Sequence, residues 1–313
     1  MTRRSTQRGH SLIELLVAMA LAALVGTIVL PAVFTLQARG LAEVSRADLQ
    51  ARAERLLRFI ADDLREAAFV AGATPRRVDG TAPVLVHDSL AGDPAETLSH
   101  ALLAEDGGTT GDDTLILVRG ESFFPPIHLE QPAVTGSATL RLDRAPNLAP
   151  GSTREIRPAP EAISHVLLAN HRTCYPVGTT GRTLSLLDVL AAPAATGTEL
   201  LGLRARRFHL ERSGSFCRLR SDDFTSDEIL DDAVDALQFE YLLDEGTWAD
   251  QPADPRRIRA VRLSLLVRDL RPDRHHRDTA TYPLGNRRYG PFNDNYRRVA
   301  VSETIEVKNH ALP

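Results

Sequence analysis

In the N-terminal part of the chain, the residue with the clearest potential for chemistry is Glu14. It directly precedes a stretch without any charged side chain. That stretch covers residues 15–34 and is composed almost entirely of aliphatic and small residues. A carboxylate in the hydrocarbon layer of a membrane costs roughly 2.5–3.5 kcal/mol on insertion scales, so a glutamate at this place usually has a function. The alternative is a glutamate that reaches back to the cytoplasmic interface.

Two cysteines, Cys174 and Cys217, are the only thiols of the chain. They are 43 residues apart, which fits neither a redox CxxC pair nor a haem attachment motif. In an oxidising compartment they could form one disulfide, provided that their Cα atoms lie within about 7 Å. The sequence leaves two readings open: a disulfide between Cys174 and Cys217, or two buried free cysteines.

Neither the histidines nor the acidic clusters predict a metal site. His275 and His276 are adjacent, so in a strand they point to opposite faces and cannot bind one ion together. A run of acids lacks the spacing and the glycine of a calcium-binding EF-hand loop. It consists of Asp222, Asp223, Asp227, Glu228, Asp231 and Asp232. We therefore expect the histidines in a solvated loop and these acids on the charged face of a helix or turn, with no metal bound.

Known catalytic motifs are absent from the sequence. It contains no GxSxG, no HExxH, no P-loop and no glycine-rich dinucleotide fingerprint. The formal net charge is −4 and the pI about 6.2, which gives no basic footprint for nucleic acid. We expect a protein that is not an enzyme, has no cofactor and does not bind nucleic acid.

The element that positions Glu14 is predicted to be a membrane-spanning helix. Twenty uncharged residues at 15–34 span about 30 Å as a helix, the thickness of the hydrocarbon core. Arg3, Arg4 and Arg8 precede this stretch, so the positive-inside rule places the N-terminus in the cytoplasm. The apolar run is too long for a secretory signal peptide and leads into a charged helical pattern. A plain single-span anchor remains an alternative.

Residues 37–70 keep a helical period and are predicted to continue the same helix. Apolar residues at spacings of three and four form a stripe that a sheet should cover. They are Leu49, Ala53, Leu56, Leu57, Ile60, Leu64, Ala67 and Ala68. Oppositely charged residues four apart are expected to pair on the other side: Asp48 with Arg52, Glu54 with Arg58, and Arg58 with Asp62. Gly72 and Pro75 are expected to end the helix.

The remainder reads as β-structure in one domain. Residues 71–113 look like a loop-rich connection, and shorter strands are expected at 114–118, 138–142, 164–169, 183–190, 206–211 and 215–220. Clear alternation over 237–243, 261–268 and 299–307 predicts strands of an antiparallel sheet with one packed and one largely polar face. Residues 271–296 are predicted to form a long loop.

The string 8–14, Arg-Gly-His-Ser-Leu-Ile-Glu, resembles the prepilin leader of the type IV pilin superfamily. In that family a prepilin peptidase cuts after the glycine on the cytoplasmic side and methylates the new N-terminus. The resemblance implies a cut between Gly9 and His10, with His10 methylated. Glu14 would then be the fifth mature residue and Pro31 the twenty-second, where pilins often carry a helix-loosening proline. Most members begin with phenylalanine or methionine, and His10 departs from this.

The resemblance also suggests a role for Glu14. After cleavage, its carboxylate can be neutralised by the N-terminal amine of a neighbouring subunit within a low-dielectric bundle of helices. Glu14 and Pro31 are therefore the expected assembly residues.

The C-terminal part is similar to PilW-type minor pilins and, more distantly, to the J-type pseudopilins of type II secretion. The similarity rests on residues 231–241, on the apolar run that ends at 265–268, and on a late strand. It implies an α+β, type IV pilin-like fold: a long N-terminal helix on an antiparallel sheet with large loop insertions. The expected parts are a leader (1–9), a transmembrane helix (10–36), its amphipathic periplasmic half (37–70) and a β-rich periplasmic domain (71–313).

The implied function is that of a minor pilin in the priming or tip complex of a type IV pilus. Expected partners are other minor pilins, the major pilin, prepilin peptidase and the inner-membrane assembly platform. The expected location is the bacterial inner membrane, in a single pass, with later incorporation into a pilus or pseudopilus. Two alternatives remain: a J-type pseudopilin, and a membrane-anchored periplasmic enzyme or binding protein.

Overall fold

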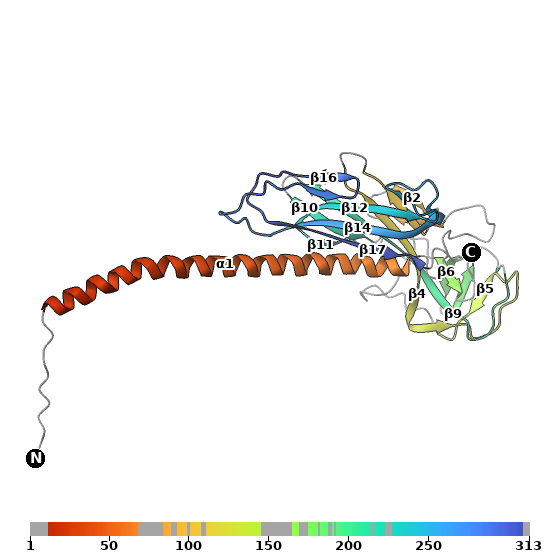
Figure 1. Cartoon of the computed structure of the whole chain (residues 1–313). Coiled ribbons are helices and arrows are strands. Elements are labelled where there is room, and N and C mark those ends of the chain that lie inside the picture. Colours follow the sequence, from red (N-terminus) through yellow and green to blue (C-terminus); the bar gives the residue numbers. More distant parts are fainter. Residues whose placement is uncertain are drawn as a thin grey trace, which may run out of the picture. The chain divides into compact units, whose positions relative to one another are not determined.

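The computed structural model describes residues 12–67, 84–88, 93–98, 101–107, 111–144, 165–168, 175–180, 182–186, 190, 192–213, 216–222 and 227–308 (Figure 1). Within these ranges only the backbone is described for 12–14, 26, 28, 30–32, 34–35, 38–39, 41–42, 84–88, 93–98, 121, 123–124, 165–168, 175–180, 203–204 and 216. The chain divides into two compact units, Met1–Ala51 and Arg52–Pro313.

The N-terminal element is the α-helix α1(Leu12–Glu66), 55 residues long. It contains the uncharged run 15–34, and its backbone stays helical at Pro31. Counting only the described residues, no helix reaches the length and hydropathy that crossing a membrane requires. The described helix ends at Glu66, and the last residues predicted for it, 68–70, lie outside the described residues.

In the second unit, α1 carries the predicted apolar stripe. The buried members of the stripe here are Ala53, Leu56, Leu57, Ile60 and Leu64, each at most 9% exposed, and Ala61, which was not predicted, is buried beside them. Burial of such side chains stabilises the fold by about 1.5–3 kcal/mol for each large one. Of the expected surface pairs, Glu54 and Arg58 lie within 3.5 Å. Asp62 instead bonds Arg65 at 2.6 Å, and Arg52 turns toward Asp231, because a buried carboxylate there needs a cation.

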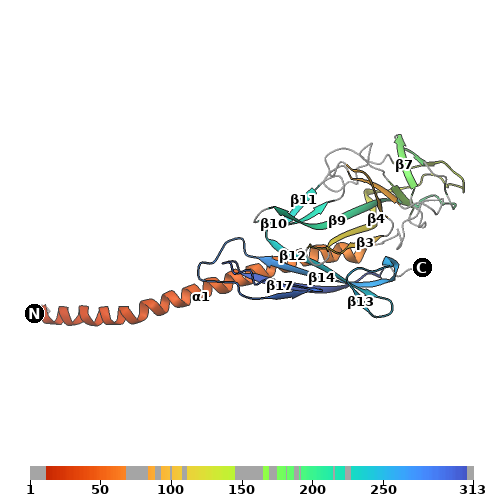
Figure 2. The ribbon, with the colours of Figure 1, turned by 90° about the horizontal axis from the view of Figure 1, so that it is seen from above.

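A four-stranded antiparallel sheet contains the most regular part of the sequence. Its order is β13(Trp248–Ala249), β12(Val234–Leu243), β14(Ile258–Arg268) and β17(Arg298–Glu306) (Figure 2). Alternate residues of the predicted strand 237–243 form its packed face: Leu237, Phe239 and Tyr241 are at most 1% exposed. The expected polar outer face is partly wrong, since Gln238 and Ser264 are also buried.

The second face of this sheet is covered by the segment that was predicted as a long loop. It contains the hairpin β15(Tyr282–Leu284) and β16(Arg287–Tyr289). Gly285 has a φ of +56° in the hairpin turn, a conformation that glycine adopts without strain. Leu284 packs with Ala236 and Leu266 of the sheet, and aromatic residues pack around them. These are Tyr282, Tyr289 and Phe292.

A nine-stranded sheet forms the rest of the second unit (Figures 1 and 2). Its main order is β11(Asp227–Asp231), β10(Phe216–Asp222), β9(Glu199–Ser213), β6(His165–Leu168), β7(Tyr175–Thr180), β8(Thr183–Leu186) and β5(Thr139–Arg141). In addition β4(Thr114–His128) pairs with β9, and β3(Leu102–Glu105) pairs with β4. β4 and β9 have 15 residues each, longer than predicted.

Further short elements lie in regions where no strand was predicted. β1(Val84–Asp88) and β2(Asp93–Leu98) pair in the segment that was expected to be a loop-rich connection. β2 reads Asp-Pro-Ala-Glu-Thr-Leu, which lacks the alternation that identifies a strand. The turn η1(Pro255–Arg257) precedes β14.

Candidate functional site

The residues predicted from the leader fall at the limits of the described chain. Gly9 and His10 lie outside the described residues, as does Cys174. Glu14 and Pro31 belong to α1, and only their backbone is described. Cleavage, methylation and the assembly roles therefore stay predictions.

Cys217 lies in β10 and is buried, with 4% exposure. Burial raises the pKa of its thiol to about 11. A thiol that is protonated at neutral pH is a weak nucleophile, so Cys217 is suited to packing rather than catalysis. Its pairing with Cys174 stays a prediction.

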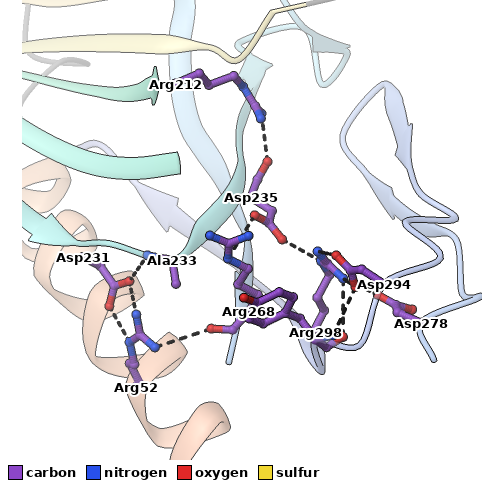
Figure 3. Close-up of polar contacts among 10 residues, drawn as sticks. Arg52, Arg212, Asp231, Ala233, Asp235, Arg268, Asp278, Asp294 and Arg298 are labelled. Carbon is purple, nitrogen blue, oxygen red and sulfur yellow. Dashed lines mark hydrogen bonds and ion pairs between the residues drawn. The ribbon is translucent and has the colours of Figure 1, made fainter. Parts of the chain in front are cut away.

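The first polar junction of the second unit links α1 to β11 (Figure 3). Arg52 donates from Nε to Asp231 Oδ2 at 2.5 Å and from Nη2 to Oδ1. Its Nη1 donates to the carbonyl of Arg268, at the end of β14, at 3.4 Å. Asp231 Oδ1 also accepts from the backbone N–H of Ala233 at 2.8 Å. One arginine thus ties the helix to strands of both sheets.

The second junction lies one turn before the end of α1. Asp63 accepts from Arg206 of β9 at 2.5 Å and lies 3.0 Å from Arg119 of β4. Arg119 also bonds Glu66. The Arg206 guanidinium lies 5.4 Å from the ring centroid of Phe59, a distance at which cations and aromatic rings attract. A carboxylate flanked by two arginines holds the helix against β4 and β9.

A third junction reaches the last strand. Arg65 donates to Glu303 of β17 at 2.6 Å, and to Asp62 of its own helix at 2.6 Å. Both partners in the cross-link are partly exposed, so this pair contributes less than the buried ones. Together, the three junctions fasten residues 52–66 of α1 to five strands.

A cluster around Arg298 holds the long loop on the sheet (Figure 3). Arg298 begins β17, and its side chain is 1% exposed. It donates to Asp235 at 2.6 Å, to Asp278 at 2.9 Å and to Asp294 at 2.7 Å. Its guanidinium lies 3.7 Å from the ring centroid of Phe292.

The charges of this cluster stabilise one another. Burial alone would lower the pKa of Arg298, but the hydrogen bonds to Asp294 and Asp235 raise it above its ordinary value. The bond from Arg298 in turn lowers the pKa of Asp294. Asp235 also lies 3.7 Å from Arg268, so two arginines share it.

Asp113 joins the segment before β4 to the central strand β12. It is 4% exposed and accepts from the backbone N–H of Phe239 at 2.8 Å and from Gln238 at 3.1 Å. The backbone N–H of Gly107 also donates to Asp113, at 3.3 Å. Burial raises the pKa of Asp113 to about 6, although the bonds from Phe239 and Gly107 lower it. This carboxyl group therefore titrates near neutral pH.

Four acids of the run lie on strands, where a helix or turn was expected: Asp222, Asp227, Glu228 and Asp231. Asp232 follows β11 in a bend, and Asp223 lies outside the described residues. Asp222 ends β10, and Asp227 and Asp231 bound β11. Asp222 pairs with Arg207 and Asp227 with Arg220, arginines of neighbouring strands, both at 2.8 Å. Asp231 pairs instead with Arg52 of α1. Over the described residues, no three metal-ligating side chains come together.

The sequence did not predict which polar residues hold the second unit together. Arg52 was expected to pair with Asp48 on the helix surface, and Asp63 and Arg298 were not among the predicted site residues. The partners of Arg52 lie 179 and 216 residues away along the chain, and no local sequence pattern indicates them. The one available signal was the abundance of arginine, since Lys308 is the only lysine, and guanidinium groups suit bidentate pairing with carboxylates.

Two protein-family models match the chain, one at its N-terminus and one in its C-terminal part. The prokaryotic N-terminal methylation motif matches residues 4–30, which include Gly9, His10 and Glu14. The family of Type IV Pilus-assembly protein W, PilW, matches residues 211–309, which include β12, β14, β17 and the Arg298 cluster. These matches confirm the resemblance to type IV pilin-like minor pilins. No curated protein and no solved structure gave a match.

Proposed function

We propose that the chain is a minor pilin of the priming or tip complex that initiates assembly of a type IV pilus. The observation that carries the proposal is the presence of both matches in one chain, the methylation motif at 4–30 and the PilW family at 211–309. The first is typical of subunits processed by prepilin peptidase, and the second of minor subunits. Such proteins act by assembly, which agrees with the absence of catalytic motifs from the sequence.

In this proposal, prepilin peptidase removes residues 1–9 and methylates His10. The uncharged run 15–34 anchors the chain in the inner membrane, and the second unit lies in the periplasm. The three arginines of the leader and the hydropathy of the run support this orientation. On assembly, the apolar helix moves from the bilayer into the fibre, and Glu14 pairs with the N-terminal amine of a neighbouring pilin.

The packing of residues 52–66 of α1 within the second unit supports a structural role. When a subunit is extracted from a membrane by its helix, the globular part must stay packed on the helix. Residues 52–66 meet this need with a buried apolar stripe and the ion pairs of Arg52 and Asp63. Buried, hydrogen-bonded pairs resist breakage, because losing one partner leaves an uncompensated charge.

Intact mass of protein extracted from membranes tests the processing step. Wild-type protein should lack residues 1–9 and carry one added methyl group on His10. Gly9→Ala should retain the leader, whereas the control Thr6→Ala, within the leader but away from the cut, should be processed normally. A mature protein that still begins at Met1 in cells with active prepilin peptidase would contradict the proposal.

Deletion of the gene then separates a minor pilin from its alternatives. We expect few or no surface pili, restored by wild-type protein and not by Gly9→Ala. Normal piliation combined with loss of protein secretion would instead identify a J-type pseudopilin. Normal results in both assays would favour a membrane-anchored enzyme or binding protein.

A further inference from the structure

The segment between β14 and β15, residues 269–281, presents an unusual set of arginines, and we name it the arginine loop. Arg271, Arg274 and Arg277 are exposed, and none of them has a carboxylate partner in the part of the chain that the structure describes. The preceding strand behaves differently: Arg259, Arg262 and Arg268 each face a carboxylate. The positive charges of these three arginines are therefore exposed to solvent and are not neutralised by a neighbouring carboxylate among the described residues.

Two of the three acids of the arginine loop, Asp273 and Asp278, do not cancel this charge, because they bond other groups. Asp273 accepts from Arg297 at 2.7 Å and from the backbone N–H of His275 at 2.9 Å. Asp278 accepts from the buried Arg298 at 2.9 Å and from the Tyr282 hydroxyl at 3.0 Å. Residues 269–298 contain seven arginines and four aspartates, although the whole chain has a net charge of −4.

Backbone hydrogen bonds fix the conformation of the arginine loop. Asp273 N–H donates to the Asn295 carbonyl at 2.7 Å, and Asp278 N–H donates to the Asp294 carbonyl at 2.8 Å. Within the loop, His276 N–H donates to the Asp273 carbonyl at 2.9 Å. A surface whose backbone is already ordered loses less entropy when it binds a ligand.

Exposed guanidinium groups on an ordered backbone bind oxyanions well, because their planar donors match the oxygens of a phosphate group. We propose that the arginine loop binds the phosphate groups of an anionic phospholipid surface. This inference rests on one part of the proposed function, namely that the run 15–34 anchors the chain in the membrane. Phe34, the last residue of the run 15–34, and Arg52 are 18 positions apart. A chain of that length spans at most about 60 Å, so the second unit stays near a bilayer.

Charge favours a membrane over nucleic acid as the ligand. A long duplex would meet the acidic remainder of the chain as well as the loop, and its phosphates would be repelled there. Lipid headgroups act individually, and each basic residue near an anionic surface contributes about 1 kcal/mol within a Debye length of it. Three arginines on one loop suit a weak contact that is released when the subunit leaves the bilayer.

Hydrogen exchange followed by mass spectrometry tests this inference on the full-length protein in vesicles. In vesicles of phosphatidylcholine with phosphatidylglycerol, amides of residues 269–281 should exchange at least about threefold more slowly than in phosphatidylcholine alone. The difference should disappear at high salt, which screens the contact. Replacement of Arg271, Arg274 and Arg277 by glutamine should abolish it.

A matched control removes three arginines from the opposite end of β14. Arg256 and Arg257 are exposed and Arg259 is partly exposed, and all three are paired with acids. Their replacement by glutamine should leave the slow exchange intact. Equal exchange in both vesicle types, or equal loss in both triple variants, would overturn the proposal. It would also be overturned if inorganic phosphate or a DNA duplex slowed exchange as well as the anionic vesicles did.

This test is independent of pilus assembly. An uncleaved chain retains the run 15–34 and can be reconstituted in the same way. Failure of the exchange experiment therefore leaves the minor pilin proposal in place, whereas failure of the processing experiment leaves the lipid contact measurable.

Discussion

Arg298 and Asp278 form an ion pair in which both side chains are only 1% exposed, with Nη1 and Oδ2 2.9 Å apart. The two residues are 20 positions apart along the chain, one at the start of β17 and the other in the long loop. Burial of two charges is costly, and it is tolerated where further hydrogen bonds satisfy both groups. Here Asp235 and Asp294 complete the shell of Arg298, and Tyr282 bonds Asp278.

The first prediction concerns this cluster. Arg298→Met should lower the free energy of unfolding by about 3–5 kcal/mol, because Asp278 and Asp235 would remain buried without their main cation. Arg298→Lys should cost less, since it keeps the charge but cannot bond Asp294 with two parallel N–H groups. Urea unfolding of the detergent-solubilised protein measures both values.

Arg256→Met is the control for this experiment. Arg256 pairs with Asp254 at 2.7 Å, but its side chain is 57% exposed, and we expect a change below about 1 kcal/mol. If Arg298→Met were no more destabilising than this control, the cluster would not hold the loop.

The second prediction concerns the link between Arg52 and Asp231. These side chains are 17% and 8% exposed, and Arg52→Met and Asp231→Asn should each destabilise the protein. Because the pair is partly buried and bidentate, the double-mutant cycle should give a coupling free energy of about 1–3 kcal/mol. The same cycle on Glu54 and Arg58, which are 46% and 71% exposed, should give at most about 0.5 kcal/mol. Equal coupling in both cycles would contradict the proposed junction.

Local patterns predicted the elements that depend on local physics. The stripe that includes Leu56, Ile60 and Leu64 follows from the helical period, and the burial of Leu237 and Leu263 from alternation. Their partners could not be predicted, because pairing over long distances depends on tertiary packing. Arg52 illustrates this: the helical spacing favoured Asp48, whereas the folded chain offers the less exposed Asp231 from β11.

The second face of the sheet was mispredicted for a related reason. Gln238 and Ser264 are polar, so the alternation suggested a solvated face. Each is buried, at 2% and 4% exposure, and the amide of Gln238 donates to Asp113 at 3.1 Å. A polar residue in a strand can face solvent, or it can be buried and bonded to a polar partner, and the sequence does not distinguish these two environments.

The third prediction uses the titration of Asp113. Its folded-state pKa, about 6, lies above the ordinary value of 3.8, so the folded chain keeps a proton that the unfolded chain releases. The stabilisation from this group is full below about pH 4 and is lost as the pH rises through 6. Between about pH 7.5 and pH 5, wild type should gain about 1.4 kcal/mol relative to Asp113→Asn.

Urea unfolding of both proteins at each pH gives this difference directly, because the other titrating groups are common to both. Parallel pH profiles of the two proteins would show that Asp113 is not protonated near neutral pH in the folded state.

The last prediction concerns Glu14 and the assembly step. Glu14→Ala removes a carboxylate and lengthens the apolar run, so insertion into the membrane should be unchanged or improved. Pairing with the N-terminal amine of a neighbouring pilin should be lost, and with it the priming of pili. Cells should hold normal amounts of the variant in the inner membrane and few surface pili by electron microscopy. Glu43→Ala, which removes an exposed carboxylate from the same helix, should leave piliation normal. Wild-type piliation with Glu14→Ala, where gene deletion abolishes pili, would reduce Glu14 to an interfacial residue.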